Sequence, residues 1–127
     1  MYTIEEVDAY LHEIVQELPE AFFQRLNGGI ILLPDCKTHP QGTGDLYIMG
    51  DYCNRYDTGR CIRIYYGSFQ RTYGRAPEHV LREKLRETLL HEFTHHLESL
   101  AGERGLEIKD KMQLEAYKRA KEEGHGG

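Results

Sequence analysis

Five consecutive residues in the second half of the chain, His91-Glu92-Phe93-Thr94-His95, form an HExxH motif. Two histidines four positions apart on a helix project from the same face, so their ring nitrogens can approach one zinc ion at about 2.0–2.1 Å. Zinc lowers the pKa of a bound water, and a carboxylate at the position of Glu92 is placed to take its proton. The motif therefore predicts hydrolysis at zinc, with His91 and His95 as metal ligands and Glu92 as general base.

The HExxH motif lies inside the longest periodic stretch of the chain, residues 77–102, which predicts a long helix. Pro77 suits the first turn of this helix, and Gly102 is placed to end it. Leucine and phenylalanine side chains surround the motif, and a buried histidine or glutamate without a metal would need other polar partners. This context favours zinc binding over a solvated helix face that is merely rich in histidine.

Several residues outside the motif are candidates for supporting roles. His96 points about 100° away from His95, which favours a position behind the metal ligands or on the surface over metal ligation. Thr88 lies one turn before His91 and either donates a hydrogen bond behind the ligands or is an ordinary helix-face threonine. Tyr65 or Tyr66 would stabilise an oxyanion, or else serve in packing. The remaining histidines have no partner at metal spacing and are predicted to be surface residues: His12, His39, His79 and His125.

Two helices are predicted before the first strand. Thr3 and Glu6 match a capping box, and apolar residues at helical spacing continue from there to Leu18. Pro19 suits the first turn of a second, short helix, and residues 27–29 (Asn-Gly-Gly) allow the positive φ that ends a helix. The apolar run at residues 30–33 is bounded by glycine and proline, which predicts a buried strand.

The middle of the chain predicts a β-hairpin. Residues 34–44 have the composition of a surface loop, and residues 45–52 and 60–66 form two strand candidates on either side of a polar turn. Apolar and polar side chains alternate along residues 60–66, which is typical of a half-exposed strand. After the helix at 77–102, a turn and a last helix from about Asp110 to Glu122 complete the expected elements.

Several of these segments together resemble a small bacterial zincin-like metallopeptidase family, formerly catalogued as a domain of unknown function. The resemblance rests on LPEAFFQRL, GDLYIMGDY and, most specifically, LRETLLHEFTHHLE, and it extends to about Tyr117. It implies a zincin-like α+β fold, in which a small mixed β-sheet packs against a long active-site helix, with N-terminal and C-terminal helices. It also implies that His91 and His95 are the zinc ligands and Glu92 the catalytic residue. By analogy with zincins, strand 60–66 would pair with an extended substrate by β-augmentation.

The third metal ligand departs from the pattern HExxHxxGxxD of that family, because Glu98 stands at the glycine position and Ala101 at the aspartate position. One solution is a longer helix and an insertion, which brings Asp110 into register as the ligand. The other is that Glu98 binds the metal, since it lies on the same helix face as the two histidines. A carboxylate is a normal third ligand in either case. Glu103 and Glu107 are weaker candidates.

Length and composition fit one domain, residues 1–127. A formal net charge of −5, from 16 Lys and Arg against 21 Asp and Glu, argues against nucleic acid as a partner. No apolar run is long enough for a membrane span and no secretory signal is evident, which predicts a cytoplasmic protein. Three cysteines without CxxC spacing, Cys36, Cys53 and Cys61, are expected to be reduced thiols.

The function expected from the sequence is a zinc metallopeptidase that hydrolyses an extended peptide or a flexible protein segment. One alternative is a non-catalytic zinc-binding or interaction domain that keeps the zincin fold. Retention of Glu92 favours the enzyme, because a structural zinc site has four protein ligands and no use for a general base. Hydrolysis of an amide other than a peptide is a further alternative. The sequence leaves the oligomeric state open.

Overall fold

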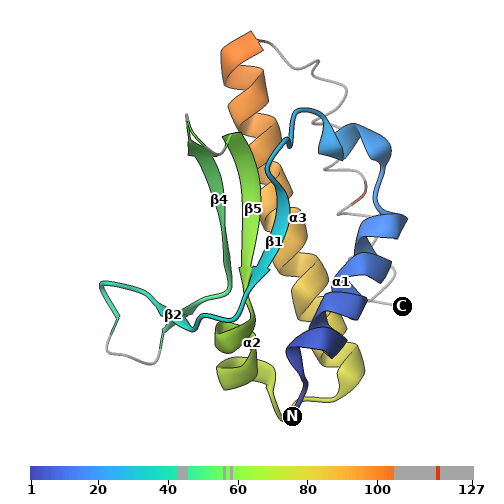
Figure 1. Ribbon diagram of the computed structural model, residues 1–127, viewed down its shortest axis with the longest axis vertical. Helices are drawn as coiled ribbons and strands as arrows, with labels where there is room; N and C mark the ends of the chain where they lie inside the picture. Colours follow the sequence, from blue (N-terminus) through green and yellow to red (C-terminus); the bar gives the residue numbers. More distant parts are fainter. Residues whose placement is uncertain (43–45, 56, 58, 105–116, 118–127) are drawn as a thin grey trace.

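The computed structural model describes residues 1–42, 46–55, 57, 59–104 and 117. These residues form an α+β fold (Figure 1). In chain order the elements are α1 (Ile4–Glu17), the 3-10 helix η1 (Glu20–Phe23), β1 (Gly29–Leu33), β2 (Lys37–Thr38), β3 (Tyr47–Ile48), β4 (Gly50–Arg55), β5 (Gly59–Tyr65), α2 (Tyr66–Tyr73) and α3 (Glu78–Arg104).

The main sheet has three strands in the order β1-β5-β4. β1 runs parallel to β5, and β4 runs antiparallel to β5, so the sheet is small and mixed, as predicted. β2 and β3 form a separate antiparallel pair that projects to one side of the sheet (Figure 1). β5 is thus the central strand of the main sheet, and β4 is one of its two edges.

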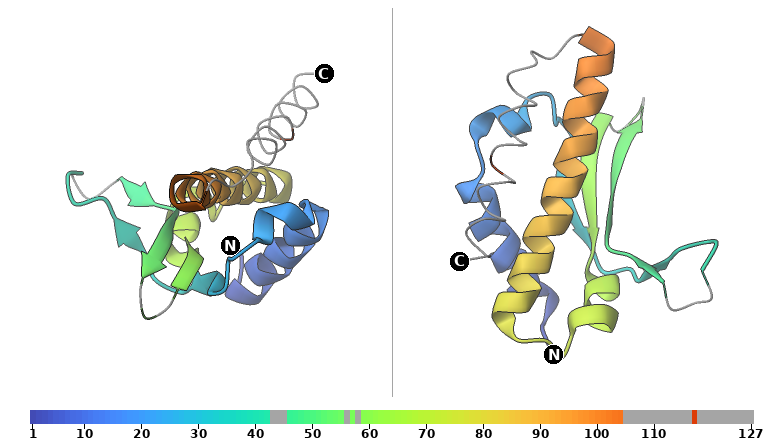
Figure 2. Two further views of the ribbon diagram at one scale, coloured as in Figure 1. Left: turned by 90° about the horizontal axis from the view of Figure 1, so that it is seen from above. Right: turned by 180° about the vertical axis from the view of Figure 1, so that it is seen from behind.

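The long helix α3 packs against β4 and β5 and, on another side, against α1 (Figure 2). The core between these elements consists of apolar side chains with little or no exposure. α1 contributes Val7, Leu11 and Ile14, β5 contributes Ile62 and Ile64, and α3 contributes Leu81, Leu85, Leu89, Phe93, Leu97 and Leu100. Because α3 carries a leucine or phenylalanine at nearly every inward position, burial fixes which of its faces turns away from the core.

The N-terminal helix follows its sequence signals. The Thr3 hydroxyl accepts from the backbone N–H of Glu6 at 3.1 Å, and the Glu6 carboxylate accepts from the N–H of Thr3 at 3.0 Å. This is the predicted capping box, which satisfies two backbone donors at the helix start. A second short helix follows, as expected, but it is a 3-10 helix and Pro19 is its N-cap rather than part of its first turn. Gly29 takes a positive φ of 72°, and Arg25 does so as well at 59°.

Two expectations for the middle of the chain are wrong, and one helix was not expected. Residues 45–52 are not one strand, because β3 pairs with β2 and a separate β4 begins at Gly50. The predicted loop 34–44 contains the short strand β2. The helix α2 (Tyr66–Tyr73), for which the sequence predicted no element, buries Phe69 and Ser68 against the rest of the fold. In each case long-range packing and pairing override weak local preferences.

The exposure of β1 and β5 also differs from expectation. β1 is an edge strand rather than a buried one, and Ile31 is 39% exposed. β5 is more buried than a half-exposed strand, because Cys61 and Tyr65 on its predicted polar face are covered. Gly102 does not end the long helix, which continues to Arg104. The burial of a strand and the end of a helix thus depend on the elements that pack against them.

The predicted C-terminal helix from Asp110 to Glu122 lies outside the described residues, apart from Tyr117, which is helical. The Tyr117 ring meets the Phe22 ring edge-on at 6.1 Å between centroids. The three cysteines have free thiols, as expected. No helix in the described ranges combines the length and the hydropathy that crossing a membrane requires.

Candidate metal centre

His91 and His95 present their side chains together on the solvent-facing side of α3. Their Nε2 atoms lie 3.1 Å apart, and the two rings meet edge to face with centroids separated by 4.7 Å. This separation is below twice the usual Zn–N distance of about 2.0–2.1 Å, so one zinc ion can contact both nitrogens. The structure thus brings the two predicted ligands to a common point, as helical spacing requires.

A cavity of about 660 Å³ opens over these two histidines. Its floor comes from α3 and its wall from the edge strand β4, through Gly50, Asp51, Tyr52, His91, Glu92, His95, Glu98 and Ser99. A second cavity of about 340 Å³ lies next to it, and the two cavities share Gly50, His91 and Glu92. Together they form a depression along the line where β4 lies beside α3.

Glu92 lines both cavities, yet its side chain is largely covered, and the residue is only 5% exposed. Burial and, secondarily, the negative charge of Asp51 raise the pKa of Glu92 to about 7. Among the described residues its carboxylate has no hydrogen-bond partner. A buried carboxylate with a raised pKa beside two convergent histidines is characteristic of a functional site, because a structural role would normally supply a polar partner.

Asp51 is the centre of a charged cluster on β4. Its carboxylate accepts from Arg63 Nε at 2.6 Å and Nη2 at 3.0 Å, from Lys37 Nζ at 3.0 Å and from the Tyr65 hydroxyl at 2.8 Å. Burial alone would raise the pKa of Asp51, but these donors outweigh it and lower that pKa. Asp51 therefore stays ionised and keeps a negative charge beside Glu92.

His96 is fully buried and belongs to neither of the two cavities. Its Nε2 lies 2.7 Å from the carbonyl oxygen of Gln24, and its Nδ1 lies 2.9 Å from the Tyr52 hydroxyl. A carbonyl only accepts, so Nε2 carries the proton and Nδ1 accepts from Tyr52. Burial lowers the pKa of His96, which keeps the ring neutral. Of the two positions predicted for His96, the one on the surface is therefore wrong.

β4 lies close to α3 at Gly50. A Cβ atom at Gly50 would lie 2.9 Å from the backbone oxygen of Arg63 and 3.0 Å from the Thr88 methyl group. The Thr88 hydroxyl donates to the Lys84 carbonyl at 2.8 Å within the same helix. Thr88 is therefore an ordinary helix-face threonine that forms part of the cavity wall.

Tyr65 and Tyr66 do not face the histidine pair. The Tyr65 hydroxyl is engaged by Asp51 and Lys37, and the Tyr66 hydroxyl donates to the carbonyl of Tyr2. Neither residue lines the cavities at His91. The tyrosine that does so is Tyr52, which sequence reasoning did not single out, although it lies in the quoted segment GDLYIMGDY. Alternation along that strand could have indicated that Gly50, Tyr52 and Asn54 share a face.

Of the carboxylates considered as a third ligand, Glu98 lines the cavity beside His95. Glu107 and Asp110 lie outside the described residues. Within the described part of the chain, no three His, Cys, Asp or Glu side chains are grouped closely enough to hold a metal ion. The choice between Glu98 and Asp110 therefore stays open.

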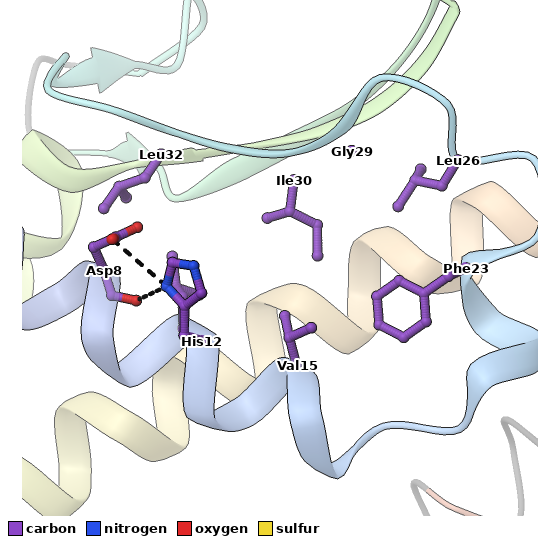
Figure 3. Close-up of a pocket in the computed structure, with 9 residues that line it drawn as sticks. Asp8, His12, Val15, Phe23, Leu26, Gly29, Ile30 and Leu32 are labelled. Carbon is purple, nitrogen blue, oxygen red and sulfur yellow. Dashed lines mark hydrogen bonds and ion pairs between the residues drawn. The ribbon is translucent and has the colours of Figure 1, made fainter.

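Another pocket, of about 260 Å³, lies between α1 and β1 (Figure 3). Apolar side chains line most of it, among them Val15, Phe23 and Ile30. At one end His12 Nδ1 lies 2.8 Å from the Asp8 carbonyl oxygen. This pocket contains no residue of the HExxH motif. His12 and His79 are exposed, as predicted, whereas His39 is half-buried and His125 lies outside the described residues.

Comparison with known proteins finds that the chain is similar to a protein of solved structure. That protein is described as a conserved hypothetical protein from Thermus thermophilus. The two sequences are 34% identical, the match covers 79% of this chain and 98% of the other, and the TM-score is 0.69. This chain belongs to the same family. No protein-family model matches the sequence, and no curated protein matches it.

Proposed function

We propose that the protein is a zinc-dependent metallopeptidase with a zincin-like fold. In this proposal His91 and His95 bind the zinc ion and Glu92 is the general base. The observation that carries it is the convergence of three side chains on one cavity. Two histidine Nε2 atoms lie 3.1 Å apart, and the buried Glu92 shares their cavity, with its pKa raised to about 7.

The donor set fits zinc. Two neutral imidazoles and a carboxylate are the usual protein ligands of a catalytic zinc ion, which keeps its fourth position for water or substrate. Glu98 or Asp110 would supply the carboxylate. When bound, zinc lowers the pKa of a coordinated water and polarises the carbonyl of the scissile bond.

Glu92 is suited to move the proton in this reaction. A general base works best when its pKa is near the working pH, and burial brings the pKa of Glu92 to about 7. As water attacks the carbonyl carbon, Glu92 accepts one of the water protons. It then delivers that proton to the leaving nitrogen as the C–N bond breaks. The same side chain thus acts first as base and then as acid.

The strand arrangement favours an extended peptide as the substrate. The prediction that strand 60–66 pairs with the substrate is wrong, because β5 is flanked by β1 on one side and β4 on the other. The edge strand that lines the cavity is β4. A peptide that pairs with its outer edge would run over α3 beside the two histidines, by the β-augmentation that many peptide-binding proteins use.

The proposal is tested by Glu92→Gln, which keeps the size of the side chain and removes the base. We expect one zinc ion per chain in both proteins, and a loss of peptide hydrolysis of about 100- to 10,000-fold in the variant. Glu5→Gln on α1 is the matched control, because Glu5 is exposed and outside the cavity. The measurement is cleavage of a mixed peptide library by zinc-loaded protein, followed by mass spectrometry.

The alternative function is a zinc-binding domain without catalysis. The departure from the pattern HExxHxxGxxD favours this alternative, because Glu98 and Ala101 stand where the glycine and the third ligand are expected. In that case the native protein and Glu92→Gln would bind zinc equally and leave the library equally intact. A native protein that retains no zinc, even after addition of excess Zn²⁺, would reject both functions.

A further inference from the structure

Two polar side chains connect α3 to its neighbours beside the proposed metal centre. The Tyr52 hydroxyl on β4 donates to His96 Nδ1 on α3, and His96 Nε2 donates to the Gln24 carbonyl after η1. The Tyr52 and His96 rings also pack at 5.4 Å between centroids. Three elements that are distant in sequence thus meet at one imidazole, which has no exposed surface.

The other side chains that α3 buries in the core are leucines and phenylalanine, whereas its ion pairs with α1, Arg82–Glu13 and Arg86–Glu17, are exposed. Apolar contacts are non-directional and tolerate small rotations or shifts of a helix at little energetic cost. The hydrogen bonds of His96 have fixed directions, and both must be kept because an unpaired nitrogen in a buried ring is unfavourable. They therefore restrict the rotation of α3 about its axis more narrowly than apolar packing does.

His96 is adjacent in sequence to the proposed zinc ligand His95, and His91 and Glu92 lie within the preceding turn and a half. A rotation of the helix would swing all three side chains relative to the wall formed by β4. Tyr52 supplies part of that wall and also holds His96. The same contact thus fixes both sides of the cavity.

We propose that Tyr52 and His96 are positioning residues, which set the rotation of α3 against β4 so that His91, Glu92 and His95 point into the cavity. This inference rests on the proposed zinc site. It assigns no contact with substrate to either residue. It predicts that the pair acts on metal binding through geometry, although neither side chain is a ligand.

The test measures the zinc affinity of Tyr52→Phe, His96→Leu and His96→Gln by competition with a chromogenic chelator. Loss of the hydroxyl in Tyr52→Phe should weaken zinc binding about 5-fold, and His96→Leu about 10- to 100-fold. His96→Gln should recover much of the affinity, because an amide can donate to Gln24 and accept from Tyr52. Leu81→Val, which trims a buried side chain near the start of α3, is the control for a general loss of stability.

A second measurement uses the metal-free protein, so that it stands independently of zinc. Tyr52→Phe should speed amide hydrogen exchange in residues 91–99 several-fold, while Leu81→Val should leave that segment like the native protein. If native protein binds zinc and the Tyr52 and His96 variants match it in affinity and exchange, the positioning role is wrong. If native protein binds no zinc, the proposed function fails, and the exchange rates alone decide whether the pair orders the helix.

Discussion

At the scale of single residues, the main feature is the contrast between two neighbouring carboxylates. Asp51 has four donor contacts that keep it ionised, whereas Glu92 is buried, has no such donor in the part of the chain that the structure describes, and holds its proton up to about pH 7. Their environments push the two pKa values apart, so that Asp51 carries a fixed negative charge while Glu92 can gain or lose a proton near neutral pH.

The pKa of Glu92 predicts how the stability of the metal-free protein depends on pH. The folded state binds the proton of the Glu92 carboxyl more tightly than the unfolded state does, in which the pKa of this group is near 4.5. Protonation of Glu92 therefore stabilises the folded state, and this stabilisation is complete below pH 4.5. It is lost as pH rises to about 7. We expect the free energy of unfolding to fall by about 1–3 kcal/mol over this interval, relative to Glu92→Gln.

This difference is measured by urea unfolding of both proteins in the presence of a chelator, at several pH values between 4.5 and 8. Glu92→Gln is the control for the native protein, because its amide side chain does not titrate. Parallel pH profiles for the two proteins would contradict the burial of Glu92, which is 5% exposed in the structure.

At the scale of secondary-structure elements, the width of the cavity depends on how closely β4 lies against α3. At one end Gly50 lies so near Thr88 that an added Cβ atom would be 3.0 Å from the Thr88 methyl group, and Tyr52 and His96 meet further along the two elements. Asn54 and Ser99 lie beyond, with 3.5 Å between amide nitrogen and hydroxyl. One strand and one helix thus set the geometry of the candidate site through three successive contacts.

Two glycine-to-alanine substitutions should have opposite effects. Gly50→Ala places a methyl group 2.9 Å from a backbone oxygen that cannot move freely, so we expect a loss of stability of about 1–3 kcal/mol. Gly102→Ala adds a methyl group in open space on α3 and should stabilise the protein by about 0.5–1 kcal/mol. Chemical denaturation of both variants measures the difference.

The pair also tests the position of β4. Gly50→Ala should weaken zinc binding or peptide cleavage, since β4 must move away from α3, while Gly102→Ala should leave both unchanged. Equal stability of Gly50→Ala and native protein would show that the close approach at Gly50 is absent in solution.

At the scale of the whole molecule, two different parts of the chain are candidates to complete the proposed metal site. Glu98 belongs to α3 itself, whereas Asp110 lies outside the described residues. The first arrangement needs only a helix face. The second makes zinc binding depend on residues outside the described part of the chain.

Alanine substitutions distinguish the two ligands. Replacement of the true ligand should lower zinc affinity by at least about 10-fold, since an inner ligand contributes no less than the outer groups that orient it. Replacement of the other carboxylate should change it little. Zinc content and affinity of Glu98→Ala and Asp110→Ala provide the measurement, with native protein as reference. Full zinc affinity in both variants would exclude both residues.

The sequence by itself determined the features that depend on local spacing. The capping box of α1, the long helix and the convergence of His91 and His95 follow from helical periodicity, because neighbours along a helix are neighbours in sequence. The mixed sheet also agrees with the expected fold class.

Only the tertiary structure decided what lies opposite that helix face. The strand boundaries at 45–52, the helix α2 and the buried position of His96 depend on pairing and packing between distant segments, which local preference does not encode. Asp51 and Tyr52 reach the cavity because β4 is an edge strand beside α3, and strand order is a property of the folded chain. The charge beside Glu92 and the partner of His96 were therefore fixed by contacts across more than 40 residues of sequence.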